Sequence, residues 1–223
     1  IKNQQWFPIN INAGGTAYNL AGDVNIVPSS LSYPGLPTSK GNRVSAVGSG
    51  YSPRLNFPDV PSTGNTPESN SYNGSVFYSA LVQINTMPGN ITGDPIISFS
   101  ALDNLSTGPT SAFFAGMFVK PNLATPDPND FLIGVSKGQT VNGDVATWGD
   151  QSYPLGATLL IVGEWQFVAN VDPLAREAND IARLYINPTQ LGGPASTSGA
   201  TMITDYGVAA DDLPLGSRSI KGI

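Results

Sequence analysis

The sequence contains neither histidine nor cysteine. Without histidine, a serine or cysteine nucleophile lacks its usual imidazole base, and zinc loses its most common protein ligand. Without cysteine there is no disulfide from which to infer the redox compartment, but a chain of 223 residues buries enough surface to fold without covalent cross-links. Carboxylate chemistry and the binding of hard cations are the chemical classes that remain open.

Charged residues are also scarce. They make up 12% of the chain, which is about half the usual share, and the formal net charge is −6. A chain with so few lysines and arginines lacks the counterion release that drives binding to phosphate backbones and the attraction to anionic lipids, so we expect no nucleic-acid partner. No apolar run reaches the length of a membrane span, so we also expect no membrane insertion.

The polar composition of the chain indicates a location outside the cell. Ser, Thr and Asn replace charged residues along much of the sequence, a composition common in proteins that work extracellularly. The chain starts at Ile1 and contains no basic stretch followed by an apolar one, so we expect that any signal peptide has been removed. The sequence therefore predicts a secreted, extracellular or cell-surface protein.

The 25 glycines and 19 prolines fall mostly between short apolar runs. Within most of these runs the apolar residues recur at every second position, which is typical of β-strands, and no segment has the 3.6-residue period of a helix. Residues 112–120 are apolar on both faces, which fits a buried strand or a short buried helix, and their β-branched and aromatic content favours the strand. The pattern predicts an all-β chain. The clearest expected strands are residues 75–86, 95–101, 112–120, 131–137, 157–171 and 181–187, with weaker ones near 23–27, 43–47, 201–204 and 217–223.

Four groups of segments, taken in order, carry a family resemblance. They are residues 30–39 with 41–44, residues 75–82, residues 114–119 with 131–137, and residues 159–162 with 179–188. Together they resemble the concanavalin A-like, laminin G-like jelly-roll modules of large secreted bacterial surface proteins. The resemblance implies a two-sheet antiparallel jelly-roll sandwich, a fold that hosts lectins, adhesion modules, hydrolases and spacers alike.

The resemblance also implies a division of the chain. Residues 30–223 correspond to a laminin G-like domain, and residues 1–29 form an N-terminal arm or edge strand. Residues 218–223 look like the start of a strand, so we expect the C-terminal strand of the domain to be cut short. Either the module continues in a longer protein, a neighbour completes the edge, or the boundary arose by expression or proteolysis.

A glycoside hydrolase is the enzyme that this fold suggests, and it needs two carboxylates roughly 5–9.5 Å apart across the scissile bond. The chain has only three glutamates, at positions 68, 164 and 177, and no two carboxylates lie two or four residues apart within an expected strand. Glu164 either contacts a ligand beside Trp165 or points outward while Trp165 packs inward, and we favour the second arrangement. The sequence therefore predicts a protein that is not an enzyme.

Calcium is the cofactor that the resemblance suggests. Asp127, Asn129 and Asp130 offer the oxygen ligands that Ca²⁺ prefers, although their spacing is not that of a dedicated calcium loop. Asp and Asn side chains in such clusters also make turns by binding the backbone two residues on. The sequence leaves both readings open and favours the turn.

A sugar-binding site needs an exposed aromatic ring and nearby polar groups. Trp148 is the best candidate platform, because we expect it in a polar loop, and Asp144, Asp150 and Tyr153 lie close to it in sequence. The alternative is that Trp148 covers the edge of a sheet.

Two further pairs of residues are candidates for contact with a partner. Trp6 and Phe7 interrupt a polar N-terminal stretch, and Ile220 and Ile223 belong to the unfinished strand. We therefore expect a non-catalytic extracellular interaction module, a structural or adhesive subunit whose partners are neighbouring protein subunits or a glycan. The alternatives are a carbohydrate-binding, lectin-like domain and, more remotely, a polysaccharide-active glycoside hydrolase.

Overall fold

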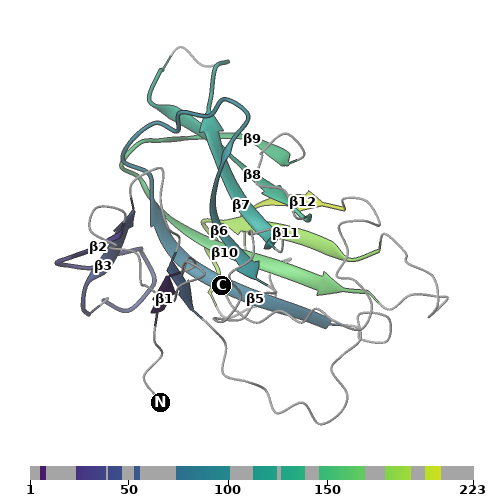
Figure 1. Ribbon diagram of the computed structural model, residues 1–223, viewed down its shortest axis with the longest axis horizontal. Helices are drawn as coiled ribbons and strands as arrows, with labels where there is room; N and C mark the ends of the chain where they lie inside the picture. Colours follow the sequence, from purple (N-terminus) through teal and green to yellow (C-terminus); the bar gives the residue numbers. More distant parts are fainter. Residues whose placement is uncertain are drawn as a thin grey trace, which may run out of the picture.

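Two four-stranded antiparallel sheets form the body of the molecule (Figure 1). The computed structural model describes residues 6–8, 24–38, 40–46, 53–55, 74–100, 113–124, 127–138, 146–168, 179–191 and 199–206. In these ranges the chain forms strands and turns, without a helix. The prediction of an all-β chain with packed antiparallel sheets is confirmed for this part of the protein.

The two large sheets differ in how the chain passes through them. The first sheet has the order β12-β11-β10-β5, with strands Thr201–Asp205, Ile181–Ile186, Thr158–Phe167 and Gly74–Gln83. The second has the order β6-β7-β8-β9, with strands Asp94–Ser100, Phe113–Pro121, Asp130–Ser136 and Thr147–Pro154. The second sheet is a simple meander, whereas the first brings β5 beside β10 from a distant part of the sequence.

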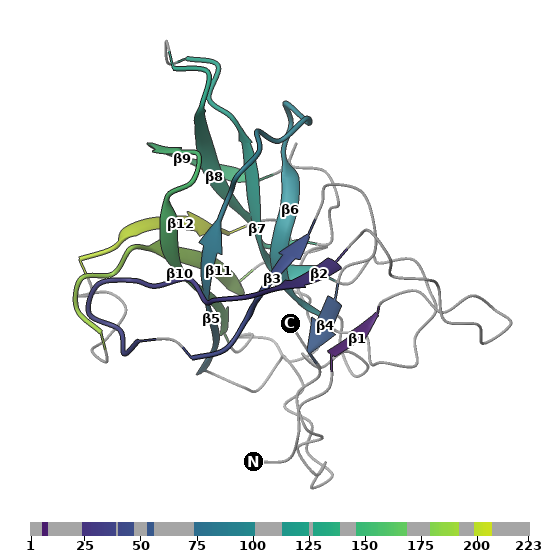
Figure 2. The same cartoon turned by 90° about the vertical axis from the view of Figure 1, so that its left-hand side faces the viewer.

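Two short ribbons accompany the large sheets. β1 (Trp6–Pro8) pairs with β4 (Pro53–Leu55), and β2 (Val24–Val27) pairs with β3 (Arg43–Ala46). Both β1 and β2 belong to the expected arm or edge strand, and each pairs with a strand of the expected domain. The β2–β3 ribbon lies beside the large sheets and is part of neither (Figure 2).

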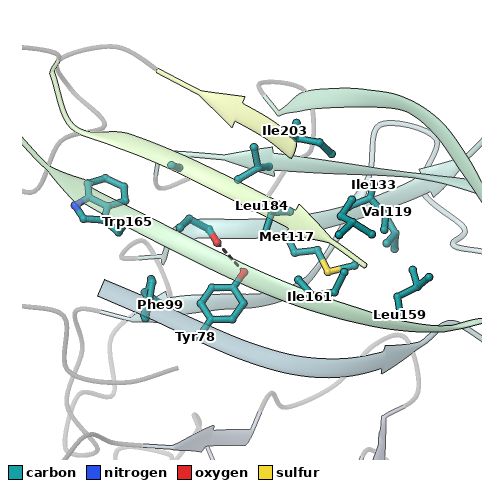
Figure 3. Packing of buried hydrophobic residues seen from close by; sticks show 14 of the residues in the cluster. Tyr78, Phe99, Met117, Val119, Ile133, Leu159, Ile161, Trp165, Leu184 and Ile203 are labelled. Atoms are coloured by element: carbon teal, nitrogen blue, oxygen red, sulfur yellow. Dashed lines mark hydrogen bonds between the residues drawn. The ribbon is translucent and has the colours of Figure 1, made fainter. Parts of the chain in front are cut away.

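The core lies between the two large sheets, where alternate side chains of facing strands meet (Figure 3). Ile161 and Trp165 of β10 are fully buried there. Facing them are apolar side chains from β7 and β8, and the core is extended by β11 and β12. These further core residues are Met117, Val119, Phe131, Ile133, Val135, Leu184, Ile186 and Ile203.

Tyr78 of β5 joins the two sheets inside this core. Its hydroxyl donates a hydrogen bond of 3.0 Å to the carbonyl oxygen of Ala115 in β7 (Figure 3), and its ring packs edge-on against Phe99 with centroids 5.0 Å apart. Burial raises the pKa of Tyr78 well above its ordinary value. Ala115 has a φ of 46° and lies where the pairing of β6 with β7 changes register, so a β-bulge aims its carbonyl at the tyrosine.

Asp205 joins the sheets again at the end of β12. Its Oδ2 accepts a hydrogen bond of 2.6 Å from the backbone N–H of Lys137, and its Oδ1 accepts one of 3.2 Å from the hydroxyl of Thr147. The side chain of Lys137 is fully buried, and its Nζ donates to the carbonyl oxygen of Tyr206 at 2.9 Å. Asp205 and Lys137 are thus buried polar residues with hydrogen-bond partners, and they connect β12 to β8 and β9 at this edge of the sandwich.

Most expected strands are present, and the differences are instructive. The six clear strands and the weaker ones near 23–27, 43–47 and 201–204 all form. The expected loop around Trp148 is wrong, because residues 147–154 form β9. The strand expected at 217–223 lies outside the described residues.

Candidate functional site

The carboxylate of Glu164 lies at the centre of a polar cluster on the outer face of the first sheet. β10 directs Trp165 into the core, so Glu164 points to the opposite face, as the sequence predicts. Its side chain is nevertheless covered, because the residue is only 6% exposed. The outer face of the sheet is therefore covered by other side chains at this position.

Side chains from β5 and β11 cover this carboxylate. Oε1 accepts a hydrogen bond of 2.6 Å from the hydroxyl of Ser75, and Oε2 accepts one of 2.6 Å from the hydroxyl of Tyr185. The guanidinium of Arg183 lies 3.3 Å from Oε2 and also donates to Gln166. Strand register explains the arrangement, since Glu164 is directly opposite Arg183.

The electrostatics of the cluster favour a structural role. Burial raises the pKa of Tyr185 well above its ordinary value, and the hydrogen bond to the negative Glu164 raises it further. Both oxygens of Glu164 are engaged by protein groups, and none of these groups is a second carboxylate. Because glycoside hydrolysis needs two carboxylates, this geometry gives the hydrolase alternative no support.

Trp148 lies on the outer face of the second sheet, where it contacts protein. It pairs with Gly134 of β8, and a Cβ added to that glycine would lie 2.8 Å from the indole ring, so the ring packs against the glycine backbone. The ammonium of Lys120 lies 4.2 Å from the ring centroid, a cation–π contact. These contacts match the sequence alternative in which Trp148 covers part of a sheet.

Of the other candidate sugar-binding residues, Tyr153 lies away from this ring. Asp150 is exposed on β9, but Tyr153 points into the core, where its ring lies 6.0 Å from that of Phe131. Trp148 and Tyr153 therefore occupy opposite faces of the sheet. Asp144 lies outside the described residues.

The candidate calcium ligands form a turn between β7 and β8. The backbone N–H of Asn129 donates to Oδ1 of Asp127 at 2.8 Å, which is an Asx turn, and the hydroxyl of Ser152 donates to Oδ2 of Asp130 at 3.0 Å. Over the residues that the structure describes, no three carboxylates come together as a metal site. The calcium site stays a prediction. In the structure, Asp127 stabilises a turn.

The β2–β3 ribbon has an unusual surface. Ile26 and Val44 are paired in register and are 65% and 43% exposed, and Ala46, two residues on from Val44, is exposed as well. We call Ile26, Val44 and Ala46 the ribbon face. On the other side of the ribbon, Arg43 and Ser45 of β3 are partly buried, together with Val27, which pairs with Arg43. In β3, therefore, the polar side chains face inward and the apolar ones face solvent. Such a reversal is typical of a surface that another molecule covers.

Local hydrogen bonds hold the ribbon in this orientation. Nη1 of Arg43 donates to the hydroxyl of Ser29 at 3.1 Å and to the carbonyl oxygen of Pro28 at 3.4 Å, and the hydroxyl of Ser30 donates to the carbonyl oxygen of Gly41 at 3.1 Å. These hydrogen bonds join the start of the connection between β2 and β3, at residues 28–30, to its end at Gly41 and to Arg43. Among the described strands, β2 and β3 pair only with each other, so each has a free edge.

The candidate partner contacts are resolved in part. Trp6 and Phe7 lie in β1, opposite Leu55 and Arg54 of β4. Ile220 and Ile223 lie outside the described residues. Sequence reasoning identifies β2 and β3 as weak strands but misses the ribbon face, because which side of a ribbon faces solvent depends on tertiary packing.

Comparisons with protein-family models, with curated proteins and with solved structures found no match to this chain. The described residues contain no helix long and apolar enough to cross a membrane.

Proposed function

We propose that this chain is a non-catalytic interaction module, a structural or adhesive subunit of a larger secreted or cell-surface protein or assembly. The ribbon face carries the proposal. An isolated two-stranded ribbon is marginally stable, and one that turns Ile26 and Val44 toward water exposes apolar area that association would bury. The finer architecture belongs to the same proposal: a concanavalin A-like jelly roll, supported by the two packed antiparallel sheets and by the ordered sequence segments.

The state of the polar groups supports a role without catalysis. Glu164 forms an ion pair with Arg183 and accepts hydrogen bonds from two hydroxyl groups. Asp205 accepts hydrogen bonds from a backbone N–H and from the hydroxyl of Thr147. The absence of histidine removes the commonest general base from the whole chain. The extracellular location is supported by the scarcity of charge and by the Ser- and Asn-rich surface.

Light scattering after size exclusion tests this function. The wild-type protein should show an average mass that rises with concentration, and the double substitution Ile26→Ser with Val44→Ser should abolish the rise. Met202→Ser is the matched control, since Met202 is another exposed apolar residue on a different strand. A wild-type mass that stays monomeric at every concentration and equals that of the ribbon variant would contradict the proposal.

A lectin-like function is the second candidate, and Phe77 favours it. Half of this side chain is exposed on the outer face of the first sheet, where register places it directly opposite Glu164, with Arg183 on the next strand. An aromatic ring beside polar groups is the usual form of a sugar subsite. Calorimetric titration of polysaccharide fragments should then lose its heat signal in Phe77→Ala and keep it in Trp148→Ala, and no heat with the wild type would exclude this candidate.

A further inference from the structure

The charges of the chain are divided unevenly along its length. Residues 24–46, which form the β2–β3 ribbon and the connection between its strands, hold two cations (Lys40 and Arg43) and no carboxylate. Residues 59–223 hold six cations and fifteen carboxylates. A basic ribbon is thus attached to an acidic body, and the body of a second copy is a surface of opposite charge.

The turn between β7 and β8 offers the surface that best complements the ribbon. Leu123 in this turn is 78% exposed, the highest value among the large apolar residues that the structure describes, and Asp127 is exposed close by in sequence. We call Leu123 and Asp127 the tip. It combines an apolar side chain with a carboxylate, whereas the ribbon combines its apolar face with the exposed cation Lys40 in the connection between its strands.

The tip is held in shape by its own hydrogen bonds. The backbone N–H of Asn122 donates to the carbonyl oxygen of Asp130 at 2.9 Å, and the backbone N–H of Ala124 donates to Oδ1 of Asn122 at 3.1 Å. With the Asx turn at Asp127, these bonds fix both ends of the turn. A surface that is already ordered loses less entropy on binding.

The tip and the ribbon lie apart on one molecule. The β7–β8 turn projects from the far end of the second sheet, whereas the ribbon lies lower, against the side of the sandwich, in both views (Figure 1 and Figure 2). A contact between them therefore requires two molecules.

We propose that the ribbon face of one copy docks on the tip of a second copy, and this inference rests on the proposed function. Leu123 covers the Ile26–Val44 pair, and the exposed Lys40 lies near Asp127 of the other molecule. Because the two surfaces differ, the contact is heterologous and joins copies head to tail, in rings if its rotation closes and in open chains if it does not.

The size of the contact sets its strength. A stable interface buries about 800 Å² on each partner, which the three small side chains of the ribbon face do not reach. A single contact is accordingly weak, and it weakens further with salt, since exposed charges are screened within about 10 Å at 0.1 M salt.

Two complementary variants test the proposal by sedimentation velocity. The ribbon variant carries Ile26→Ser and Val44→Ser. The tip variant carries Leu123→Ser and Asp127→Asn, in which the amide oxygen still accepts the hydrogen bond from Asn129. Each variant alone is expected to sediment as a monomer, while an equal mixture forms dimers and nothing larger, because it contains one intact tip and one intact ribbon per pair.

The outcomes separate this inference from the function on which it rests. A tip variant that associates like the wild type, or a mixture that stays monomeric while the wild type associates, overturns the head-to-tail contact and leaves the interaction module standing. A wild-type protein that stays monomeric at millimolar concentration and low salt overturns both.

Discussion

The ring of Tyr78 lies directly on Gly163 across the β5–β10 pair, so closely that a Cβ on the glycine would lie 2.1 Å from Cζ of the tyrosine. The absence of a side chain at Gly163 is what allows the ring to lie flat and its hydroxyl to reach Ala115 in the opposite sheet. The contact between Tyr78 and Gly163 within the first sheet thus positions the hydrogen bond that joins the two sheets.

Gly163→Ala should therefore destabilise the fold strongly. The added methyl group has no space unless the buried ring moves, and overpacking of this kind costs about 3 kcal/mol. Urea denaturation measures the loss in free energy of unfolding. Gly89→Ala is the control, since a Cβ there meets nothing within 4 Å, and equal stability of the two variants would contradict this role of Gly163.

Stability should fall above pH 10. Burial raises the pKa of Tyr78 above its value in the unfolded chain, so above pH 10 the unfolded state loses a proton that the folded state retains. The stabilising contribution is complete below pH 10 and declines by about 1.4 kcal/mol per pH unit for each such tyrosine. Denaturation curves from pH 9 to 11.5 should show this slope, and Tyr78→Phe should make it shallower. An unchanged slope in the variant would show that Tyr78 titrates normally.

The bond between Tyr185 and Glu164 should show measurable coupling. Tyr185→Phe leaves a buried carboxylate with one donor fewer, and hydrogen bonds to charged groups contribute about 1.5–3 kcal/mol. In a double-mutant cycle with Glu164→Gln, the two losses in the free energy of unfolding should sum to more than the loss in the double variant. Additive losses would mean that the two side chains act independently.

Asn187 should tolerate glycine better than alanine. Its φ is 54°, and its Oδ1 accepts a hydrogen bond of 3.0 Å from the backbone N–H of Leu160. Asn187→Gly keeps the backbone conformation and loses only the hydrogen bond, at roughly 1 kcal/mol, whereas Asn187→Ala adds the strain of a left-handed backbone and costs roughly 2 kcal/mol or more. Thermal denaturation should rank the variants in this order, and the reverse order would contradict the account of this turn.

The strands with strong alternation could be predicted from the sequence, and β9 could not. In β10, large apolar residues occupy every inward position except Gly163, so the period of two is easily recognised. In β9 the inward positions include Gly149, where the side chain of Ile203 fills the space that a Cβ would need. Where a side chain from a neighbouring strand fills the core beside a glycine, the strand that contains the glycine lacks the apolar alternation by which it could be recognised.

The candidate site shows the same limit. The composition could predict the scarcity of catalytic groups, because it depends on residue types alone. The ribbon face could not be predicted, since Val44 and Arg43 are neighbours in one strand and only the packing determines which of them faces solvent. Likewise, Glu164 is correctly assigned to the outer face, but its burial depends on side chains of β5 and β11 far away in sequence.

The most direct test of the ribbon as an interaction surface uses the absence of cysteine, which lets a single introduced thiol carry a photo-crosslinker. Ala46→Cys places the probe on the ribbon face without removing Ile26 or Val44, and Met202→Cys places it on the outer face of β12 as a control. After irradiation, mass spectrometry of the digested protein should show adducts between chains from position 46, mapped to the peptide that contains Leu123, and few from position 202. Adducts between chains that are no more frequent from position 46 than from position 202 would contradict the account.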